Sequence, residues 1–355
     1  MGTFIIAEAG VNHNGSLDTA VQLIDVAVAA GADAVKFQTF KAEKLVTKTA
    51  NKAEYQKQTT ASNESQFEML RKLELKYAWH LLLRDYCQKQ GIVFLSTAFD
   101  VDSLAFLVHE VGIERLKIPS GEITNGPFLL AHAQTGKAII LSTGMATLGE
   151  IETALGVLAF GYLGCNKPCL TGFQEAYASP EGQALLKQNV TLLHCTSEYP
   201  TPPEHVHLRA LGTLQQAFGL AVGYSDHTEG LAIPVAAVAC GARVIEKHFT
   251  LDRTLEGPDH KVSLEPSELK YMVSAIRTIE LALGSAHKTP QPIELQNRDV
   301  ARKSLVAATD IKVGDRFDAT NLTCKRPGTG LSPMIFWQLQ EKNSPHHYQI
   351  DDLIE

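Results

Sequence analysis

The feature that most constrains the fold is a regular alternation over the first 283 residues of short apolar, β-branched runs with stretches of helical length. Most of the runs are nearly continuous in apolar residues, which is typical of parallel strands covered on both faces. Eight runs are interpreted as strands, at 4–8, 34–38, 93–98, 115–119, 138–142, 190–196, 221–225 and 244–249. Helices are predicted at 17–30, 66–90, 102–111, 127–134, 149–160, 208–218, 230–240 and 265–283. Eight strands, each followed by a helix, predict an α/β fold of the (β/α)8 TIM-barrel type.

The texture of the sequence changes after this predicted barrel of residues 1–283. Residues 284–300 are polar and contain two prolines, which indicates a linker. Residues 301–355 form a small C-terminal domain that is too short for a substantial core of its own. We therefore expect this domain to dock on a barrel, either its own or a partner's. Residues 161–189 are interpreted as an insertion on the bottom or side of the barrel, away from the chemistry.

Charge and composition exclude several classes of protein. The net charge of −7 argues against nucleic acid or an anionic membrane as the main partner. No apolar run approaches the roughly 20 residues that cross a bilayer, and the N-terminus lacks the basic region of a signal peptide. The six cysteines are scattered, which indicates reduced thiols and a cytoplasmic protein. Cys165 and Cys169 are close in sequence but have no second pair nearby, so no zinc site is expected there.

Polar side chains occur at the end of every predicted strand, where TIM barrels carry their chemistry. Buried charges are costly unless they are paired or used, so this pattern predicts an active site at the barrel mouth. In strand order these residues are Glu8, Lys36, Gln38, Thr97, Lys117, Ser120, Glu122, Ser142, Ser197, Ser225, His227, Glu246 and His248.

Lys36 and Lys117 lie inside apolar strands, where lysine is rare. With hydroxyl groups from neighbouring strand ends, two ammonium groups could clamp a phosphate or a phosphate-carboxylate substrate. Two alternatives stay open. The lysines could form buried salt bridges to Glu8 or Glu122, or one of them could form a Schiff base.

His227 and His248 fall at the ends of neighbouring strands 7 and 8. With a carboxylate from Asp226, Glu246 or Asp259, they would form a divalent-metal site with open positions, which suits Mn²⁺ or Mg²⁺. The alternative is a pair of hydrogen-bonded histidines without a metal. Glu8 and Glu122 are candidates for proton transfer.

Ordered motifs along nearly the whole chain resemble the sialic acid synthase family. They include IAEAGVNHNG at 6–15, VKFQT at 35–39, KIPSGE at 117–122, LSTGM at 141–145, SDHT at 225–228, EKHFT at 246–250 and KRPG at 325–328. The tail resembles the antifreeze-like (SAF) domain of that family, a small β-clip.

The resemblance implies an enzyme that condenses phosphoenolpyruvate with the open-chain form of an N-acetylated mannose-type sugar, giving a nonulosonic acid and phosphate. It implies that phosphoenolpyruvate is held by Lys36, Thr97, Lys117, Ser120, Ser142 and Ser225. Ser197 is a further candidate for substrate binding, at a position where N-acetylneuraminate synthases are expected to carry asparagine. It implies sugar contacts from Glu8, Gln38, Tyr199 and Asp259. The expected catalytic residues are Glu8, Lys117, Glu122 and Glu246. His227 and His248 would bind the metal, with Mn²⁺ first and Mg²⁺ or Co²⁺ as alternatives. Family members are swapped homodimers, in which the SAF arginine, here Arg326, reaches the partner's site.

Within the family, the run CTSEY at 195–199 is closest to legionaminate synthases, which predicts 2,4-diacetamido-2,4,6-trideoxymannose as the sugar. Residues 344–355 depart from the usual SAF ending, which predicts an incomplete domain. The alternatives are an N-acetylneuraminate synthase using N-acetylmannosamine, a Schiff-base aldolase, and a non-catalytic carbohydrate-binding protein.

Overall fold

A computed structural model describes residues 2–52, 56, 60 and 64–355 of the chain. Its contacts divide the chain into two units, Met1–Gly284 and Ser285–Glu355. Each unit has its own hydrophobic core.

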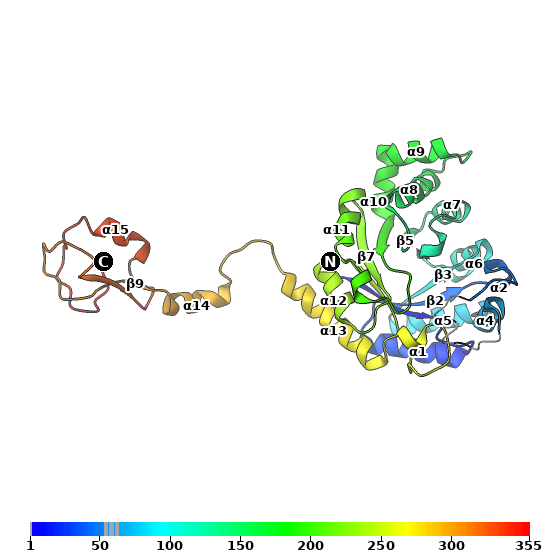
Figure 1. The fold of residues 1–355 in the computed structure, drawn as a ribbon, viewed down its shortest axis with the longest axis horizontal. Coiled ribbons are helices and arrows are strands. Elements are labelled where there is room, and N and C mark those ends of the chain that lie inside the picture. Colours follow the sequence, from blue (N-terminus) through cyan, green and yellow to red (C-terminus); the bar gives the residue numbers. More distant parts are fainter. Residues whose placement is uncertain (1, 53–55, 57–59, 61–63) are drawn as a thin grey trace. The chain divides into compact units, whose positions relative to one another are not determined.

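The first unit is a closed barrel of eight parallel strands in sequence order, so the predicted α/β-barrel fold is confirmed (Figure 1). β1 pairs with both β2 and β8, which closes the barrel. The strands are β1 (Phe4–Gly10), β2 (Ala34–Thr39), β3 (Val93–Ala98), β4 (Arg115–Ile118), β5 (Ala138–Ser142), β6 (Val190–His194), β7 (Ala221–Asp226) and β8 (Val244–His248).

Helices follow the strands and cover the barrel. They are α1 (Leu17–Ala30), α2 (Ala42–Leu45), α4 (Gln66–Lys72), α5 (Tyr77–Gln90), α6 (Val101–Phe106) with a π-helical turn (Leu107–Val111), α7 (Gly126–Gln134), α8 (Leu148–Tyr162), α11 (Ala210–Phe218), α12 (Ala232–Ala239) and α13 (Pro266–Leu283). Short 3₁₀ turns lie at Ser120–Glu122, Pro203–His205 and His260–Val262. The ends of α1 follow from the sequence. Ser16 caps its N-terminus by accepting from Thr19 N, and Gly31 ends it in a left-handed conformation.

Residues 161–189 contain two helices, α9 (Leu170–Ala178) and α10 (Pro180–Asn189), which pack against α8. Cys169 and Ser179 cap their N-termini, and Phe173 of α9 meets Phe160 of α8 edge to face at 5.1 Å between ring centroids. The segment is thus an additional helical layer on the barrel wall.

The second unit contains α14 (Pro292–Ala301), the antiparallel strands β9 (Ser304–Ala307) and β10 (Leu322–Lys325), a 3₁₀ turn (Pro333–Ile335) and α15 (Phe336–Leu339). The predicted linker 284–300 therefore needs correction, because α14 occupies its second half. A capping box of Gln291 and Glu294, with Pro292 in the first turn, starts that helix. Residues 344–355 also belong to this unit, since Tyr348 and Ile354 are buried in its core.

All six cysteines lie among the described residues and are free thiols. Within the described residues, no helix combines the length and apolar character that a bilayer crossing requires.

Candidate active site

A cavity of about 360 Å³ opens at the carboxyl ends of the barrel strands. Its size is within the usual range for sites that bind small molecules. The barrel brings to it fourteen of the sixteen residues predicted from the sequence. They are Glu8, Lys36, Gln38, Thr97, Lys117, Ser120, Ser142, Ser197, Tyr199, Ser225, His227, Glu246, His248 and Asp259.

Lys36 and Lys117 form a buried cluster with two carboxylates at the floor of this cavity. Lys36 Nζ lies 2.6 Å from Glu8 Oε2 and 3.6 Å from Glu246 Oε2, and it donates to Thr97 Oγ1 at 3.0 Å. Lys117 Nζ lies 3.5 Å from Glu246 Oε1. The salt bridge to Glu8 predicted as an alternative is therefore present. It does not exclude anion binding, since both lysines also line the cavity.

The two carboxylates respond differently to burial. Burial raises the pKa of Glu8 to about 7, because the nearby Lys36 offsets the lost hydration only in part and Glu246 repels the charge. Burial also raises the pKa of Glu246. The charges of Lys117 and Lys36 and the hydrogen bond from the Ser225 hydroxyl outweigh this effect, so the pKa of Glu246 falls to about 2. Glu246 is thus the permanent counter-charge, and Glu8 can hold or release a proton near neutral pH.

Small hydroxyl side chains surround Lys117. Its Nζ donates to Ser142 Oγ at 2.7 Å. Ser120 Oγ accepts from Gly144 N at 3.0 Å and lies 3.1 Å from Cys195 Sγ. Ammonium and hydroxyl donors converge here, as the recognition of an oxyanion requires.

His227 and His248 lie side by side, with 5.8 Å between ring centroids. Burial lowers both pKa values, so the rings are neutral at pH 7. His227 Nδ1 donates to the Thr196 carbonyl at 2.7 Å, which leaves Nε2 as the free lone pair. His248 Nδ1 is buried without a hydrogen-bond partner and lies 3.9 Å from Asp259 Oδ2. Burial raises the pKa of Asp259 to about 6.

These two histidines fit a divalent cation. A neutral imidazole held by a carbonyl through one nitrogen, as in His227, is the usual form of a metal-binding histidine. The Nδ1 of His248 is buried without a hydrogen-bond partner, which calls for a ligand. The described residues contain no cluster of three or more His, Cys, Asp or Glu side chains able to hold a metal. A two-histidine site would leave its remaining positions to water and substrate.

Three predicted or candidate residues lie elsewhere. Glu122 is outside the cavity lining, and its Oε2 accepts from Asn125 Nδ2 at 2.7 Å, because the 3₁₀ turn at 120–122 directs it toward the start of α7. Asp226 is not available to a metal, because it is paired with the buried Lys247. Arg326 belongs to the second unit, where it is exposed and its Nε donates to the Ala301 carbonyl.

The apolar side of the cavity was not predicted from the sequence. Side chains from the connection between β2 and α5 line it, together with Phe99 after β3 and Cys195 after β6. The one sequence feature that could have indicated this lining is the length of the connection, which begins at the carboxyl end of β2. Strand-end polarity could not reveal it, because the residues are apolar.

Comparisons with known proteins agree with this geometry. The NeuB family model matches residues 23–288, and the SAF domain model matches residues 302–339. The chain is 50% identical over 352 residues to an N,N'-diacetyllegionaminic acid synthase of Campylobacter jejuni, covering 99% of this chain and 98% of the relative. It is 46% identical over 333 residues to the synthase of that name from Legionella pneumophila, covering 94% and 88%.

A solved structure with the same fold is the N-acetylneuraminic acid synthetase of Leptospira borgpetersenii, crystallised with citrate. It superposes with a TM-score of 0.67 at 36% identity, covering 84% of this chain and 90% of the other. The family match covers most of the chain and the identities extend over nearly all of it. The chain therefore belongs to the NeuB family, carries a SAF domain and is an enzyme, as the resemblance predicted.

Proposed function

We propose that this enzyme condenses phosphoenolpyruvate with the open-chain form of 2,4-diacetamido-2,4,6-trideoxymannose, giving N,N′-diacetyllegionaminate and phosphate. The observation that carries the proposal is the placement of two buried ammonium groups and two neutral imidazoles in one cavity, on a chain 50% identical to a legionaminic acid synthase.

Phosphoenolpyruvate is an anion with a phosphate and a carboxylate. Lys36, Lys117, Ser120 and Ser142 supply donors for both groups, and the N–H of Gly144 orients the Ser120 hydroxyl by donating to its oxygen. The Glu246 carboxylate lies within 3.6 Å of both ammonium groups, and its charge favours the protonated form of each lysine. A bound anion would share their charge, which is the role of a preorganised clamp.

The reaction forms a bond between the methylene carbon of phosphoenolpyruvate and the aldehyde carbon of the sugar. Water adds to the carbon that bears phosphate, and the bond from that carbon to the phosphate oxygen breaks. The aldehyde oxygen gains one proton and the water loses two, of which one leaves with phosphate. Glu8 is placed for this exchange, because its pKa of about 7 lets it carry either proton state.

His227 and His248 would hold a divalent cation, with Mn²⁺ first and Mg²⁺ or Co²⁺ as alternatives. When bound, that cation supplies Lewis-acid polarisation of the sugar aldehyde and orients the attacking water. The sugar side of the site is completed by Tyr199, Gln38 and Asp259. The ring centroid of Tyr199 lies 4.2 Å from that of His227.

A phosphate-release assay on the full-length enzyme tests this function. We expect phosphate with 2,4-diacetamido-2,4,6-trideoxymannose and a lower kcat/KM with N-acetylmannosamine. Lys117→Met should lose activity, and the matched control Lys137→Met should not, since Lys137 pairs with Glu114 on the surface. A higher kcat/KM with N-acetylmannosamine would instead make the enzyme an N-acetylneuraminate synthase.

A Schiff-base aldolase is the second candidate, because burial and the neighbouring Lys36 lower the pKa of Lys117. Borohydride would then trap a covalent adduct between Lys117 and the substrate. Phosphate release without an adduct would exclude this mechanism.

The proposal extends to assembly and location. The second unit has a small core, and its exposed Arg326 has a guanidinium suited to an anionic substrate. We therefore propose a swapped homodimer in which Arg326 completes the partner's site. The six free thiols are consistent with a cytoplasmic enzyme.

A further inference from the structure

One side of the cavity is an apolar wall. It consists of Leu45, Val46, Met69, Leu70, Leu73 and Phe99. The same cavity is lined by the lysines, hydroxyls and histidines described above, and by Gln56 and Gln66 from the connection that carries most of the wall. The cavity thus combines polar groups that can bind charge with six side chains that offer no hydrogen-bond partner.

Half of the wall comes from one face of α4. Met69, Leu70 and Leu73 follow Gln66 at the i, i+3, i+4, i+7 spacing of one helical face, and all four line the cavity. Met69 and Leu73 are buried and form a small hydrophobic core with Val11 and Phe40. Leu70 remains partly exposed, so part of its side chain is available to a ligand.

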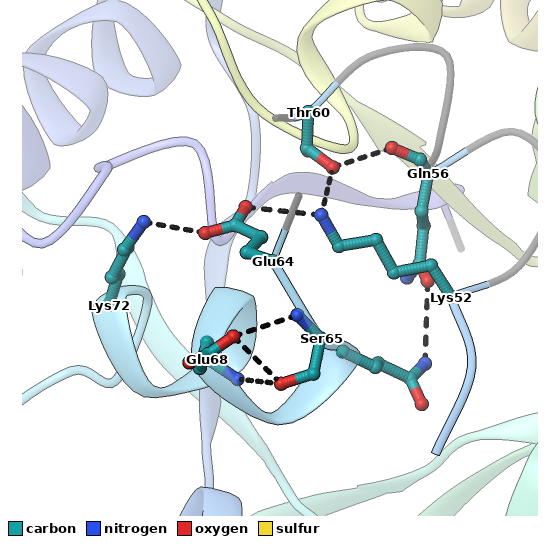
Figure 2. A network of polar contacts seen from close by, with 8 residues as sticks. Lys52, Gln56, Thr60, Glu64, Ser65, Glu68 and Lys72 are labelled. Atoms are coloured by element: carbon teal, nitrogen blue, oxygen red, sulfur yellow. Dashed lines mark hydrogen bonds and ion pairs between the residues drawn. The ribbon is translucent and has the colours of Figure 1, made fainter. Parts of the chain in front are cut away.

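A network of polar contacts surrounds the start of α4 (Figure 2). Ser65 and Glu68 form a capping box at the helix start. Glu64 binds Lys72 on one side, at 2.5 Å, and Lys52 on the other, at 3.1 Å. The Lys52 ammonium also donates to Thr60 Oγ1 at 2.9 Å. The network joins the helix to the chain before it, which keeps the wall in place without a bound ligand.

We propose that this wall selects the sugar by binding its methyl-bearing substituents, and that Leu70 is a specificity-determining residue. This inference rests on the proposed function. The trideoxy sugar has a C6 methyl group and a second acetamido methyl, where N-acetylmannosamine has hydroxyl groups at C6 and C4. A hydroxyl packed against the six apolar side chains would lose its hydration without gaining a partner from them, whereas a methyl group gains packing.

The size of the expected preference follows from the same chemistry. A difference of one methyl or methylene in an apolar pocket discriminates by about 10- to 200-fold in kcat/KM. We expect the wild-type enzyme to favour the trideoxy sugar by a ratio in this range.

The test measures kcat/KM for both sugars, and KM for phosphoenolpyruvate, in wild-type enzyme and Leu70→Gln. This substitution replaces the branched apolar end of the side chain with a hydrogen-bonding amide. We expect the ratio between the sugars to fall about tenfold while KM for phosphoenolpyruvate changes less than about twofold. The matched control is Leu82→Gln, because Leu82 is 56% exposed on α5 and does not line the cavity.

Leu70→Met guards against a trivial loss of folding, since it keeps the wall apolar and should retain the wild-type ratio. An equal loss with both sugars in Leu70→Gln, with Leu70→Met normal, would overturn the role of the wall and leave the proposed function intact. Absence of phosphate release with either sugar in the wild-type enzyme would overturn the proposed function, and this inference with it.

Discussion

Lys247 and Asp226 form an ion pair inside the barrel wall, with 2.6 Å between Nζ and Oδ2 and no exposure of either side chain. The pair joins β8 to β7. Asp226 also accepts from Thr228 N at 3.0 Å and from Thr228 Oγ1 at 3.2 Å, and Lys247 donates to the Thr228 carbonyl. The turn that carries His227 is thereby fixed from both sides.

Removing one partner of this pair should be strongly destabilising. We expect Asp226→Asn to lower the free energy of unfolding by about 3–5 kcal/mol, because it leaves the Lys247 charge buried without a counter-charge. Urea denaturation measures this loss. The control is Arg316→Met, which removes an exposed ion pair with Glu341 and should cost less than about 1 kcal/mol. An equal loss of unfolding free energy in Asp226→Asn and Arg316→Met would show that the buried ion pair stabilises the fold no more than an exposed one.

Removal of the His248 imidazole should abolish turnover without unfolding the barrel. We expect His248→Ala to reduce phosphate release at least about a hundredfold, and EDTA to do the same to the wild-type enzyme. Metal content by mass spectrometry should fall in His248→Ala. His287→Ala, an exposed histidine outside the barrel, is the control. Metal-stimulated activity retained in His248→Ala would refute its role as a ligand.

The side chains around the anion site leave no room for a Cβ at position 144. A Cβ at this position would lie 2.5 Å from Ser197 Oγ, 2.8 Å from Ser120 Oγ and 3.0 Å from Cys195 Sγ. These side chains would have to turn away. We therefore expect Gly144→Ala to raise KM for phosphoenolpyruvate about tenfold or more.

The control for that substitution is Gly212→Ala in α11, where nothing lies within 4 Å of the added methyl group. It should leave KM unchanged and stabilise the helix by up to about 1 kcal/mol. An unchanged KM in Gly144→Ala would show that the anion binds elsewhere in the cavity.

A buried histidine far from the cavity lining should make stability depend on pH. Burial lowers the pKa of His132 to about 4, its Nδ1 donates to the Phe128 carbonyl, and its Nε2 has no partner. In the unfolded chain the ring titrates near 6.5. Its contribution to stability is therefore complete above pH 6.5 and is lost as the pH falls toward 4.

From this shift we expect wild-type enzyme to lose about 2 kcal/mol more than His132→Gln between pH 7.5 and pH 5 in urea denaturation. The exposed His109 provides the control, and His109→Gln should follow the wild-type profile. Parallel pH profiles for wild type and His132→Gln would be inconsistent with a neutral buried ring.

A shared active site predicts complementation between two inactive variants. Arg326→Ala and Lys117→Ala should each be inactive, but exchanging their subunits should create dimers with one intact site. Statistical exchange would restore about a quarter of wild-type activity. No recovery, with exchange verified by native mass spectrometry, would count against the swapped dimer.

The sequence by itself determined the barrel and most of its mouth. Near-continuous apolar runs that alternate with helical stretches are typical of parallel strands covered on both faces, and strand ends such as Lys36, Lys117 and His248 carry polar groups that packing does not need. The closed barrel then places these residues in one cavity, because its strands all end on the same side.

Only the tertiary structure decided which polar groups are used and what covers them. Glu122 and Asp226 carry the same carboxylate as Glu8, but a turn directs one away and Lys247 neutralises the other. The apolar wall around Leu70 was also invisible to sequence patterns, because an apolar helical face looks the same whether it covers a core or a ligand. Orientation and burial depend on contacts between residues distant in sequence, and those contacts exist only once the chain has folded.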